Sequence, residues 1–496
     1  MVNFEHEQNI EVLRQAGKLL EQENRRLMAK VLELTQRLIA ARGEDQTRLQ
    51  LEIQSLNEIL AKRNKALFGD STERRSRTKD ARHPEPRKGH GPREQRELRI
   101  VDEPHDLDAA DKICRACGGD LVPMKGEAEE SEEITVIERE FVLVKHRRLK
   151  YRCSCNGCIE TAPAPLRLVK GGRYSTDFAI EVAAQKYLDH LPLERQVRIM
   201  AREGLKIDSQ TLWDQIEALA RAAQPIYERL LAYILSQPLL GADETRWRMM
   251  GAKGDEGESK RWQVWALAAP DAVGFRIEDS RSAAAAKKVL DGFSGVAMVD
   301  GYGVYASLAK ESGTFTLAHC WAHVRRKFIE CEEAYPTQAG EALQLIAELY
   351  EVERSCPPGA DGDELRAQLR RERSREVVSR IHAWALEQRG VLPQSALGKA
   401  IAYMGGLWNG LVRFLDDPRI PLDNNATERA LRGVVVGRKN HYGSRSRRGT
   451  EVAAVLYSLF ESAKLVGIEP KAYLRFAISA VLRSETPLLP HEYAAL

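Results

Sequence analysis

Two aspartates follow apolar segments that predict strands, and they are the clearest chemical signal in the chain. Asp243 ends QPLLGA, and Asp300 ends GVAMV. If these strands are neighbours, the two carboxylates converge at one edge of a sheet, where they repel each other unless a proton or a cation intervenes. Mg²⁺ or Mn²⁺ prefers such oxygen ligands. Two such ions, about 3.5–4 Å apart, can serve the attacking and the leaving oxygen of a phosphodiester displacement.

A third carboxylate is needed opposite this pair, and Glu428 in LDNNATERALRG is a candidate at the start of a helix. Its spacing also has plainer explanations. Asn425 and Glu428 fit a capping box, and Glu428 could pair with Arg432 one turn later. The two aspartates could equally be turn residues. Three other acids are rivals for the site: Glu244, Asp423 and Glu451.

Basic residues are dense in HCWAHVRRKF and in the segment that follows Glu428. Such a density suits contact with DNA phosphates, which supplies affinity more than sequence choice; a solvated basic face is the alternative. The candidate phosphate contacts are Arg325, Arg326, Lys327, Arg432, Arg438, Lys439, Arg445, Arg447 and Arg448. His319, Cys320 and His323 are interpreted as packing residues rather than metal ligands.

The region that must position these residues, 236–465, alternates strand and helix patterns. Segments at 261–269, 272–280, 295–299 and 314–320 predict further strands. Hairpin-like strands followed by strand–helix units predict a mixed α/β sheet. Residues 335–415 are highly charged and helical in pattern, which indicates a helical insertion into that sheet domain.

Five of the eight cysteines lie in one short segment. The polar, acidic N-terminus is not a secretory signal, and in such a chain clustered cysteines favour metal binding over disulfides. A CxxC turn and a second cysteine group, joined by strand-like residues, predict a structural tetrahedral zinc site. Reduced free thiols are the alternative. The candidate ligands are Cys114 and Cys117, with two of Cys153, Cys155 and Cys158.

The N-terminal segment has a heptad pattern. Its d positions are Leu13, Leu20, Leu27 and Leu34, and Asn24 lies at an a position. This pattern predicts a coiled coil, and the Asn favours a parallel dimer; one amphipathic helix packed on its own core is the alternative. Residues 71–99 are basic, rich in proline and almost without apolar residues, which predicts an unfolded linker.

Residues 175–235 predict helices, with a short turn after Gly204. Such a pair favours a helix-turn-helix, in which the N-terminus of the second helix reads base edges. The reading residues would be Ser209, Gln210 and Thr211; an ordinary helical hairpin is the alternative. The formal net charge of +3 does not by itself argue for nucleic acid. No apolar run approaches the ~20 residues that cross a bilayer.

Several motifs occur in an order that resembles one known family. They are LFGDSTE, CRACGGDL with KYRC and TAPAP, GADETRW, VDGYGVY, AHCWAHVRRKF and LDNNATERALRGVVVGRKNHYGS. In these motifs the chain resembles the DDE-class transposases of the insertion-sequence-66 family, over almost its whole length. The resemblance implies a ribonuclease-H-like core with a helical insertion before the last acid. It also implies that Asp243, Asp300 and Glu428 are a catalytic triad holding two Mg²⁺ or Mn²⁺ ions.

The fold class expected is therefore α+β and multidomain. The expected parts are a leucine-zipper coiled coil (1–68), a basic linker (69–99), a zinc-finger module (100–168), a helix-turn-helix region (169–235), a ribonuclease-H-like core (236–334 and 416–465), a helical insertion (335–415) and a C-terminal tail (466–496). Relative to the family pattern, Cys158 is an additional cysteine, since Cys153 and Cys155 fit the usual places.

The resemblance also implies partners and location. DNA, as transposon inverted-repeat ends and target, is the expected substrate, bound by a homodimer or larger assembly in the bacterial cytoplasm at the nucleoid. Two small accessory proteins of the same element are further expected partners. The alternative function is a noncatalytic DNA-binding regulator derived from a transposase; a metal-dependent nuclease that cuts without joining is a third.

Overall fold

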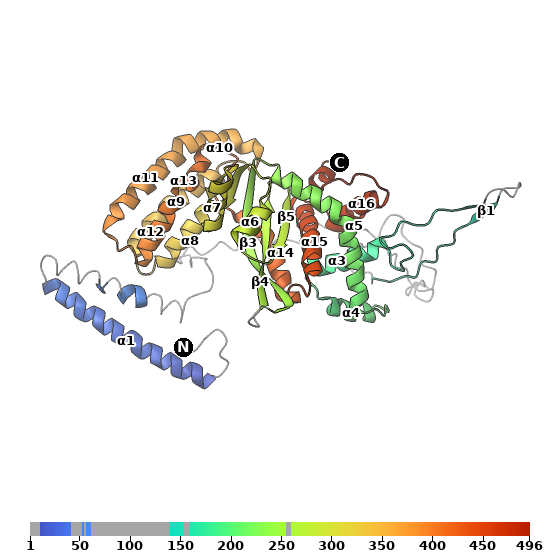
Figure 1. Ribbon diagram of the computed structural model, residues 1–496. Coiled ribbons are helices and arrows are strands. Elements are labelled where there is room, and N and C mark those ends of the chain that lie inside the picture. The colour runs from blue at the N-terminus through green and yellow to red at the C-terminus, as the bar shows by residue number, and fades with distance from the viewer. Residues whose placement is uncertain (1–9, 41–51, 54–55, 61–138, 153–158, 254–258) are drawn as a thin grey trace, which may run out of the picture. The chain divides into compact units, whose positions relative to one another are not determined.

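The structure is a computed structural model that describes residues 10–40, 52–53, 56–60, 139–152, 159–253 and 259–496 (Figure 1). The chain forms two compact units: residues 1–69 with 141–496, and residues 70–140. All five candidate zinc ligands, between Cys114 and Cys158, lie outside the described residues. Within the described ranges, no helix is long and apolar enough to cross a membrane.

A five-stranded mixed sheet organises the first unit. Its strand order is β5-β4-β3-β6-β7. The first three strands along the chain pair antiparallel, and β6 and β7 are added parallel to β3. This confirms the predicted mixed α/β sheet. The strands are β3 (Leu239–Lys253), β4 (Ser259–Ala268), β5 (Val273–Glu278), β6 (Gly295–Val299) and β7 (Phe315–His319).

One prediction about this sheet is wrong. Asp243 was expected at the end of its strand, yet β3 continues from Leu239 to Lys253. The residues after Asp243 keep pairing with β4, through Arg248↔Arg261. The parallel pairing with β6 stops earlier, at Gly241↔Met298. Asp243 therefore lies where β3 has lost its parallel neighbour but still has its antiparallel one.

The helices that connect and cover the sheet follow the predicted order. They are α6 (Ala283–Val289), α7 (Gly303–Ser312), α8 (Trp321–Cys331), α14 (Asn425–His441) and α15 (Arg447–Leu465). The glycine-rich loop between α14 and α15 bonds to β3, since Met250 N donates to Ser444 O at 2.7 Å. Because of these bonds, the end of α14 is tied to the far end of β3.

The edge strand β5 is protected by side chains rather than by another strand. Ser462 and Ser458 of α15 accept hydrogen bonds from the backbone N–H groups of Val273 and Phe275, at 2.9 and 2.8 Å. Tyr227 donates its hydroxyl to Phe275 O at 2.8 Å. Unpaired edge strands invite pairing with other chains, so these bonds close the edge with groups of the same chain.

Residues 335–415 are helical, as predicted, and form a second hydrophobic core with α8. Figure 1 shows these helices gathered away from β5, on the α8 side of the sheet. A buried ion pair fixes the group: Arg370 donates to both carboxylate oxygens of Glu353, at 2.8 and 2.9 Å. The α-helices of this insertion are α9 (Pro336–Arg354), α10 (Asp363–Leu369), α11 (Arg375–Glu387), α12 (Ala396–Gly406) and α13 (Trp408–Leu411).

The helices before the sheet share its main core. Tyr227 of the long helix α5 bonds to β5, and the buried residues of α3, α5, α15 and the sheet form one cluster. The segment expected as a C-terminal tail also contributes, since Tyr473 and Leu474 are fully buried in that cluster. The helices are α3 (Thr176–Tyr187), α4 (Leu193–Arg202), α5 (Ser209–Leu235), α16 (Pro470–Leu482) and α17 (Pro490–Ala494).

At its N-terminal end the first unit has one long helix, α1 (Ile10–Ala40), over the segment with the heptad pattern. Of the seam residues whose side chains are described, Leu34 is buried and Leu27 is half-buried, while Met28 and Leu32 between them are exposed. Within 139–152, the described part of the strand-like segment before Cys153, the strand is β1 (Lys150–Arg152), which pairs with β2 (Ile159–Thr161). Residues 139–149 form no strand, contrary to expectation.

Gly241 gives the fold its most testable constraint. A Cβ atom there would overlap Thr427 Oγ1 and lie 2.8 Å from Asn424 Oδ1, at the start of α14. We expect Gly241→Ala to displace α14 from β3 and to lower the free energy of unfolding by about 1–3 kcal/mol, the usual range for overpacking. Denaturant unfolding measures this, with Gly303→Ala as the control, because a Cβ at Gly303 meets open space. Equal stability of the two variants would contradict the proposed close contact.

Candidate active site

Helix α14 runs along the face of β3 that carries Asp243. Side chains two residues apart on a strand share a face, so Gly241, Asp243 and Thr245 point the same way. Gly241 faces the start of α14 at Thr427. Thr245 accepts a hydrogen bond from Arg438, in the last turn of α14, at 3.2 Å. Asp243 therefore points toward α14 between these two contacts.

Asp300 lies beside Asp243 across the sheet. It is the residue after β6, and β3 pairs with β6 in the parallel register Gly241↔Met298. Two residues further along each strand, that register sets Asp243 opposite Asp300. Local backbone bonds hold both carboxylates: Glu244 N donates to Asp243 Oδ1 and Tyr302 N donates to Asp300 Oδ1, each at 2.8 Å. The charge of Asp300 also raises the pKa of Asp243, so the two carboxylates lie within electrostatic reach of each other.

Electrostatics single out Asp243 among these acids. Its pKa is raised to about 7, chiefly by burial; the bond from the Glu244 amide lowers it, and the negative charges of Glu244, Asp300 and Glu428 raise it. A carboxylate in this position is stabilised by any nearby cation. The charge of Glu428 reaches Asp243 as well, since it raises the pKa of that carboxyl.

Glu428 lies in the first turn of α14, but it does not cap that helix. The N-cap residue is Asn424, no side-chain capping bond is present, and Glu428 N bonds to Asn424 O at 3.1 Å. The capping-box interpretation is therefore wrong. The carboxylate instead faces α8, with Oε1 3.7 Å from His323 Nε2 and Oε2 4.0 Å from Arg326. Glu428 Oε1 is buried without a hydrogen-bond partner.

The end of β7 and the segment after it add groups that sequence reasoning assigned only to packing. His319 is the last residue of β7, beside β6, and burial lowers its pKa. Cys320 is the N-cap of α8, and burial raises the pKa of its thiol to about 11. Cys320, His323 and Glu428 each offer one ligand atom, and these atoms lie within 4.8 Å of one another. The C-x-x-H spacing directly after a strand was the available signal for this group.

The rival acids have other partners. Glu244 faces away from α14, and its side chain is 1% exposed. It accepts hydrogen bonds from Arg281 Nε and from the Tyr305 hydroxyl, each at 2.6 Å. Asp423 accepts from Asn425 N at 3.0 Å and so holds the start of α14. Glu451 pairs with Arg448 at 3.1 Å, on α15. Of the rivals, Glu244 is the one that adjoins the aspartates.

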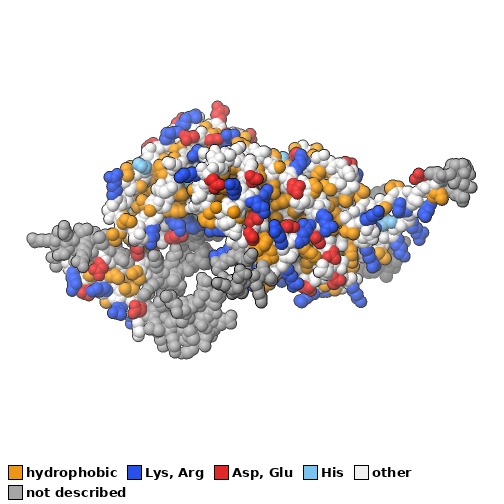
Figure 2. Space-filling model, viewed as in Figure 1, with side chains coloured by type: hydrophobic (Ala, Val, Ile, Leu, Met, Phe, Trp, Pro, Cys, Tyr) orange, Lys and Arg blue, Asp and Glu red, His pale blue; other side chains and the backbone are white. Residues whose placement is uncertain are grey.

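The predicted phosphate contacts fall into three groups. Arg438 is bonded to the backbone O of Arg246 and to Thr245, and Arg448 is bonded to Glu217 and Glu451. These two arginines are engaged within the protein. Arg325, Arg326 and Lys327 lie on α8, where Arg326 adjoins Glu428 and Lys327 pairs with Glu330. The exposed members of the set near α14 are Arg432, Lys439, Arg445 and Arg447. Figure 2 shows basic and acidic side chains interspersed over the visible face.

The three predicted base-reading residues lie at the N-terminus of α5. Asp208 caps that helix by accepting from Thr211 N at 2.7 Å. Gln210 is exposed and donates to Asp214 at 2.8 Å, one turn further on. Ser209 and Thr211 are half-buried. The structure thus leaves Gln210 as the most accessible of the three.

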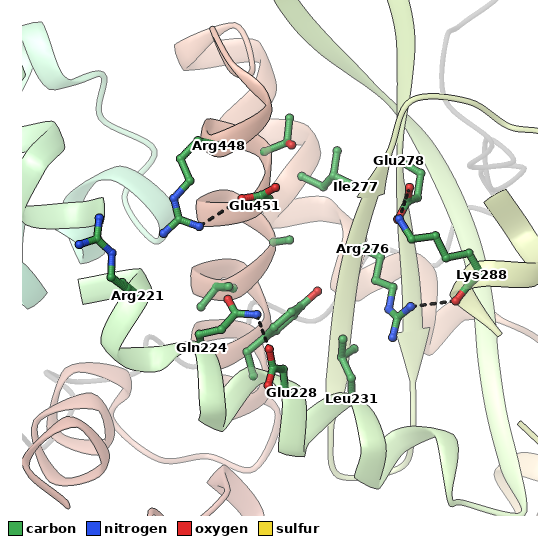
Figure 3. A pocket seen from close by; sticks show the side chains of 14 residues that line it. Arg221, Gln224, Glu228, Leu231, Arg276, Ile277, Glu278, Lys288, Arg448 and Glu451 are labelled. Carbon is green, nitrogen blue, oxygen red and sulfur yellow. Dashed lines mark hydrogen bonds and ion pairs between the residues drawn. The ribbon is translucent and has the colours of Figure 1, made fainter. Parts of the chain in front are cut away.

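A cavity of about 460 Å³ lies between α5, β5 and α15, and none of the three acids lines it (Figure 3). Its polar side chains pair with one another: Arg448 with Glu451, Lys288 with Glu278, and Gln224 with Glu228. Arg276 donates to Lys288 O. Because these groups satisfy one another, the cavity has the character of a gap between packed elements, and the carboxylate cluster is the stronger candidate for chemistry.

Comparison with known proteins gives a consistent result. A model described as "Transposase IS66 family" matches residues 171–452, and one described as "zinc-finger binding domain of transposase IS66" matches residues 111–156. Uncharacterized protein y4jD of Sinorhizobium fredii is 35% identical over 401 residues, which cover 77% of this chain and 77% of that protein. Uncharacterized protein y4qI of the same organism is 30% identical over 443 residues, covering 86% and 78%.

The raised pKa of Asp243 predicts a pH-dependent stability. The folded value, about 7, lies above the ordinary value of 3.8, so ionisation disfavours the fold. In metal-free protein, this group should lower the free energy of unfolding by about 1.4 kcal/mol per pH unit between pH 4 and 7, and by no more above pH 7. Asp243→Asn should therefore gain stability over the wild type as pH rises from 5 to 7.

Thermal or denaturant unfolding at several pH values, in chelator, measures this difference. Asp291→Asn is the control, since Asp291 is exposed. Parallel pH profiles for Asp243→Asn and the wild type would refute the assigned environment of Asp243. Added Mg²⁺ should remove the loss in the wild type, because a cation stabilises the ionised form.

Proposed function

Because this chain belongs to the IS66 transposase family, we propose that it is a DNA transposase that binds the terminal inverted repeats of its own element and catalyses metal-dependent strand cleavage and strand transfer. The observation that carries this proposal is the register that sets Asp243 opposite Asp300, on the sheet face toward which α14 brings Glu428. The two comparisons support transposition and a zinc finger. The assignment of the chemistry to these three acids is our inference.

The sheet supports a ribonuclease-H-like core as the scaffold of this activity. Three antiparallel strands precede two parallel ones, and the order β5-β4-β3-β6-β7 sets the first strand at the centre. We propose the core as residues 236–334 with 416–465, interrupted by the insertion at 335–415. The insertion's second hydrophobic core supports its treatment as a separate part. The remaining proposed divisions are those given above, with the leucine zipper at 1–68 and the zinc finger at 100–168.

The donor set fits Mg²⁺ or Mn²⁺. Asp243 and Asp300 supply oxygen ligands side by side, and Glu428 Oε1 is a buried oxygen that lacks a hydrogen-bond partner. A pair of such ions, when bound, activates the attacking oxygen of water or of a DNA 3′-hydroxyl and stabilises the leaving oxygen. The protein's own part is to hold the ligands: the amides of Glu244 and Tyr302 orient the two aspartates. Asp243 would hold its ion as a carboxylate and release its proton to solvent.

We further propose which surfaces hold DNA. The exposed residues Arg432, Lys439, Arg445 and Arg447 follow Glu428 along α14 and the loop after it, so phosphates held there would pass close to the acids. Arg326, beside Glu428, is placed to contact the phosphate nearest the site. Helix α5 would read base edges through Gln210 and its neighbours Ser209 and Thr211. Residues 10–40 would join two copies as a parallel coiled coil.

For the zinc finger, the extent of the family match favours one ligand set. The match covers residues 111–156 and so includes Cys153 and Cys155 but not Cys158. We propose Cys114, Cys117, Cys153 and Cys155 as the four ligands of a structural zinc ion. A site with four protein ligands has no open position and contributes to folding rather than to chemistry.

The triad assignment predicts the loss of chemistry without the loss of binding. Asp243→Ala, Asp300→Ala and Glu428→Ala should each reduce cleavage and strand transfer in Mg²⁺ by at least about 100-fold, the scale for one stabilising group. Binding of end DNA should stay within a few-fold of the wild type in a gel-shift titration. Glu451→Ala is the matched control, because Glu451 is a carboxylate paired on the surface.

Three results would overturn parts of this proposal. Near wild-type strand transfer by any one of the three variants would remove that residue from the site. End binding by the wild-type chain without any cleavage would favour a noncatalytic regulator. Cleaved but never joined products would favour a nuclease.

The zinc assignment predicts unequal roles for the clustered cysteines. Cys158→Ser should keep the finger's zinc in metal analysis of the purified full chain. Cys153→Ser and Cys155→Ser should each lose one equivalent, since a thiolate ligand is removed. The reverse order, with Cys158 required and Cys153 dispensable, would contradict the proposed set.

A further inference from the structure

A second set of metal-ligating atoms adjoins the proposed triad and differs from it in chemistry. Cys320, His323 and Glu428 each contribute one ligand atom, and these atoms lie within 4.8 Å of one another. In the part of the chain that the structure describes, this is the group of three that meets that separation. Two of its members come from the segment that follows β7, and Glu428 comes from α14.

The separations are close to those of a bound tetrahedral ion. With Zn–S near 2.3 Å and Zn–N or Zn–O near 2.0–2.2 Å, neighbouring ligand atoms are about 3.3–3.6 Å apart. His323 Nε2 and Glu428 Oε1 are already 3.7 Å apart. At that distance they make no hydrogen bond. Closing the set therefore requires side-chain shifts of about 1 Å, without movement of the sheet.

The surroundings of the sulfur suit a bound thiolate. Asn424 N donates to Cys320 Sγ at 3.2 Å. Cys320 is also the N-cap of α8, where free backbone N–H groups and the helix dipole favour negative charge. A backbone donor aimed at a buried sulfur is the kind of supporting contact that metal-bound thiolates have.

We propose that Cys320, His323 and Glu428 form a binding site for Zn²⁺ or a similar thiophilic divalent ion, distinct from the oxygen-only set of Asp243 and Asp300. Sulfur and imidazole ligands favour Zn²⁺ and exclude Mg²⁺, which requires oxygen. Binding forms one bond from the metal to sulfur, one to nitrogen and one to oxygen. The thiol proton leaves to solvent. The fourth position stays open, since the side chains of His323 and Glu428 are both partly exposed.

The consequence for activity rests on the proposed function. Glu428 belongs to both sets, so an ion held with Cys320 and His323 turns that carboxylate away from Asp243 and Asp300. Zn²⁺ would then inhibit strand transfer reversibly, even with Mg²⁺ in excess. The site thereby makes transposition sensitive to the supply of thiophilic metal.

Cobalt titration tests the site independently of activity. The full chain, with its finger first loaded with zinc, should bind one further Co²⁺ with a near-ultraviolet sulfur-to-cobalt absorption band. Cys320→Ser and His323→Gln should weaken that binding by more than about 100-fold, beyond the range for a merely supporting contact. Cys331→Ser is the matched control, because Cys331 is also a buried cysteine of α8. Absence of a further ion, or an unchanged band in Cys320→Ser, overturns the proposal.

A second measurement separates this proposal from the proposed function. Strand transfer in Mg²⁺ is titrated with Zn²⁺ for the wild type, Cys320→Ser and Cys331→Ser. Cys320→Ser should require at least about tenfold more Zn²⁺ for half-inhibition, in line with its weaker metal binding. Equal inhibition of all three refutes the regulatory role. If cobalt binds as expected but Glu428→Ala still transfers strands, the metal site stands and the triad assignment fails.

Discussion

The close contact between β3 and the start of α14 is the constraint on which the rest of the site depends. Glycine at 241 leaves no side chain between the strand and Thr427, and Asn424 donates its amide to Ala242 O at 3.0 Å. These contacts fix where α14 begins, and Glu428 follows within its first turn. Since Asp243 lies two residues after Gly241 on the same face, one contact determines the approach of two acids that are far apart in sequence.

The approach of α14 to β3 brings several carboxylates close together, and the surrounding structure neutralises only some of their negative charge. Glu244 on the opposite face is neutralised by Arg281, whose guanidinium also lies over the ring of Tyr302, 3.7 Å from its centroid. Among the residues that the structure describes, Asp243 and Asp300 accept hydrogen bonds only from backbone amides. A pair left this way is costly without a cation and favourable with one. The fold therefore stabilises the charge of Glu244 with its own groups, whereas the charges of Asp243 and Asp300 need a bound cation.

Sequence reasoning succeeded where a pattern is local. Periodicity predicts the strands at 261–269 and 295–299, the helical insertion and the helices from 175 to 235. Burial on one face of an element produces a regular spacing of apolar residues along the sequence. Sequence reasoning failed at the end of β3. The residues after Asp243 show the same pattern of side chains whether the strand pairs on one side or on both sides. Which strands are neighbours depends on the tertiary structure, and the tertiary structure shows that the parallel pairing of β3 with β6 stops at Gly241.

Glu428 is a second case in which a local pattern did not predict the tertiary contacts of a residue. Its spacing from Asn425 fits a capping box, yet the cap is one residue earlier and the carboxylate faces α8. The direction of the Glu428 side chain depends on Cys320 and His323, about a hundred residues away. No helical pattern around Glu428 contains that information. For the same reason the C-x-x-H segment was underestimated: a cysteine and a histidine one turn apart become a ligand set only when a third group is brought to them.

The long helix α5 connects the proposed DNA-reading residues to the sheet that carries the acids. Its 27 residues span about 40 Å at 1.5 Å per residue. Its N-terminus carries Gln210, and Tyr227 near its other end bonds to the backbone of β5. A helix packed into the core of the sheet cannot reorient without disrupting that core. If α5 reads DNA as proposed, the distance from the bases it reads to the acids on β3 is set by the fold, and the phosphodiester that is cut is chosen by that distance.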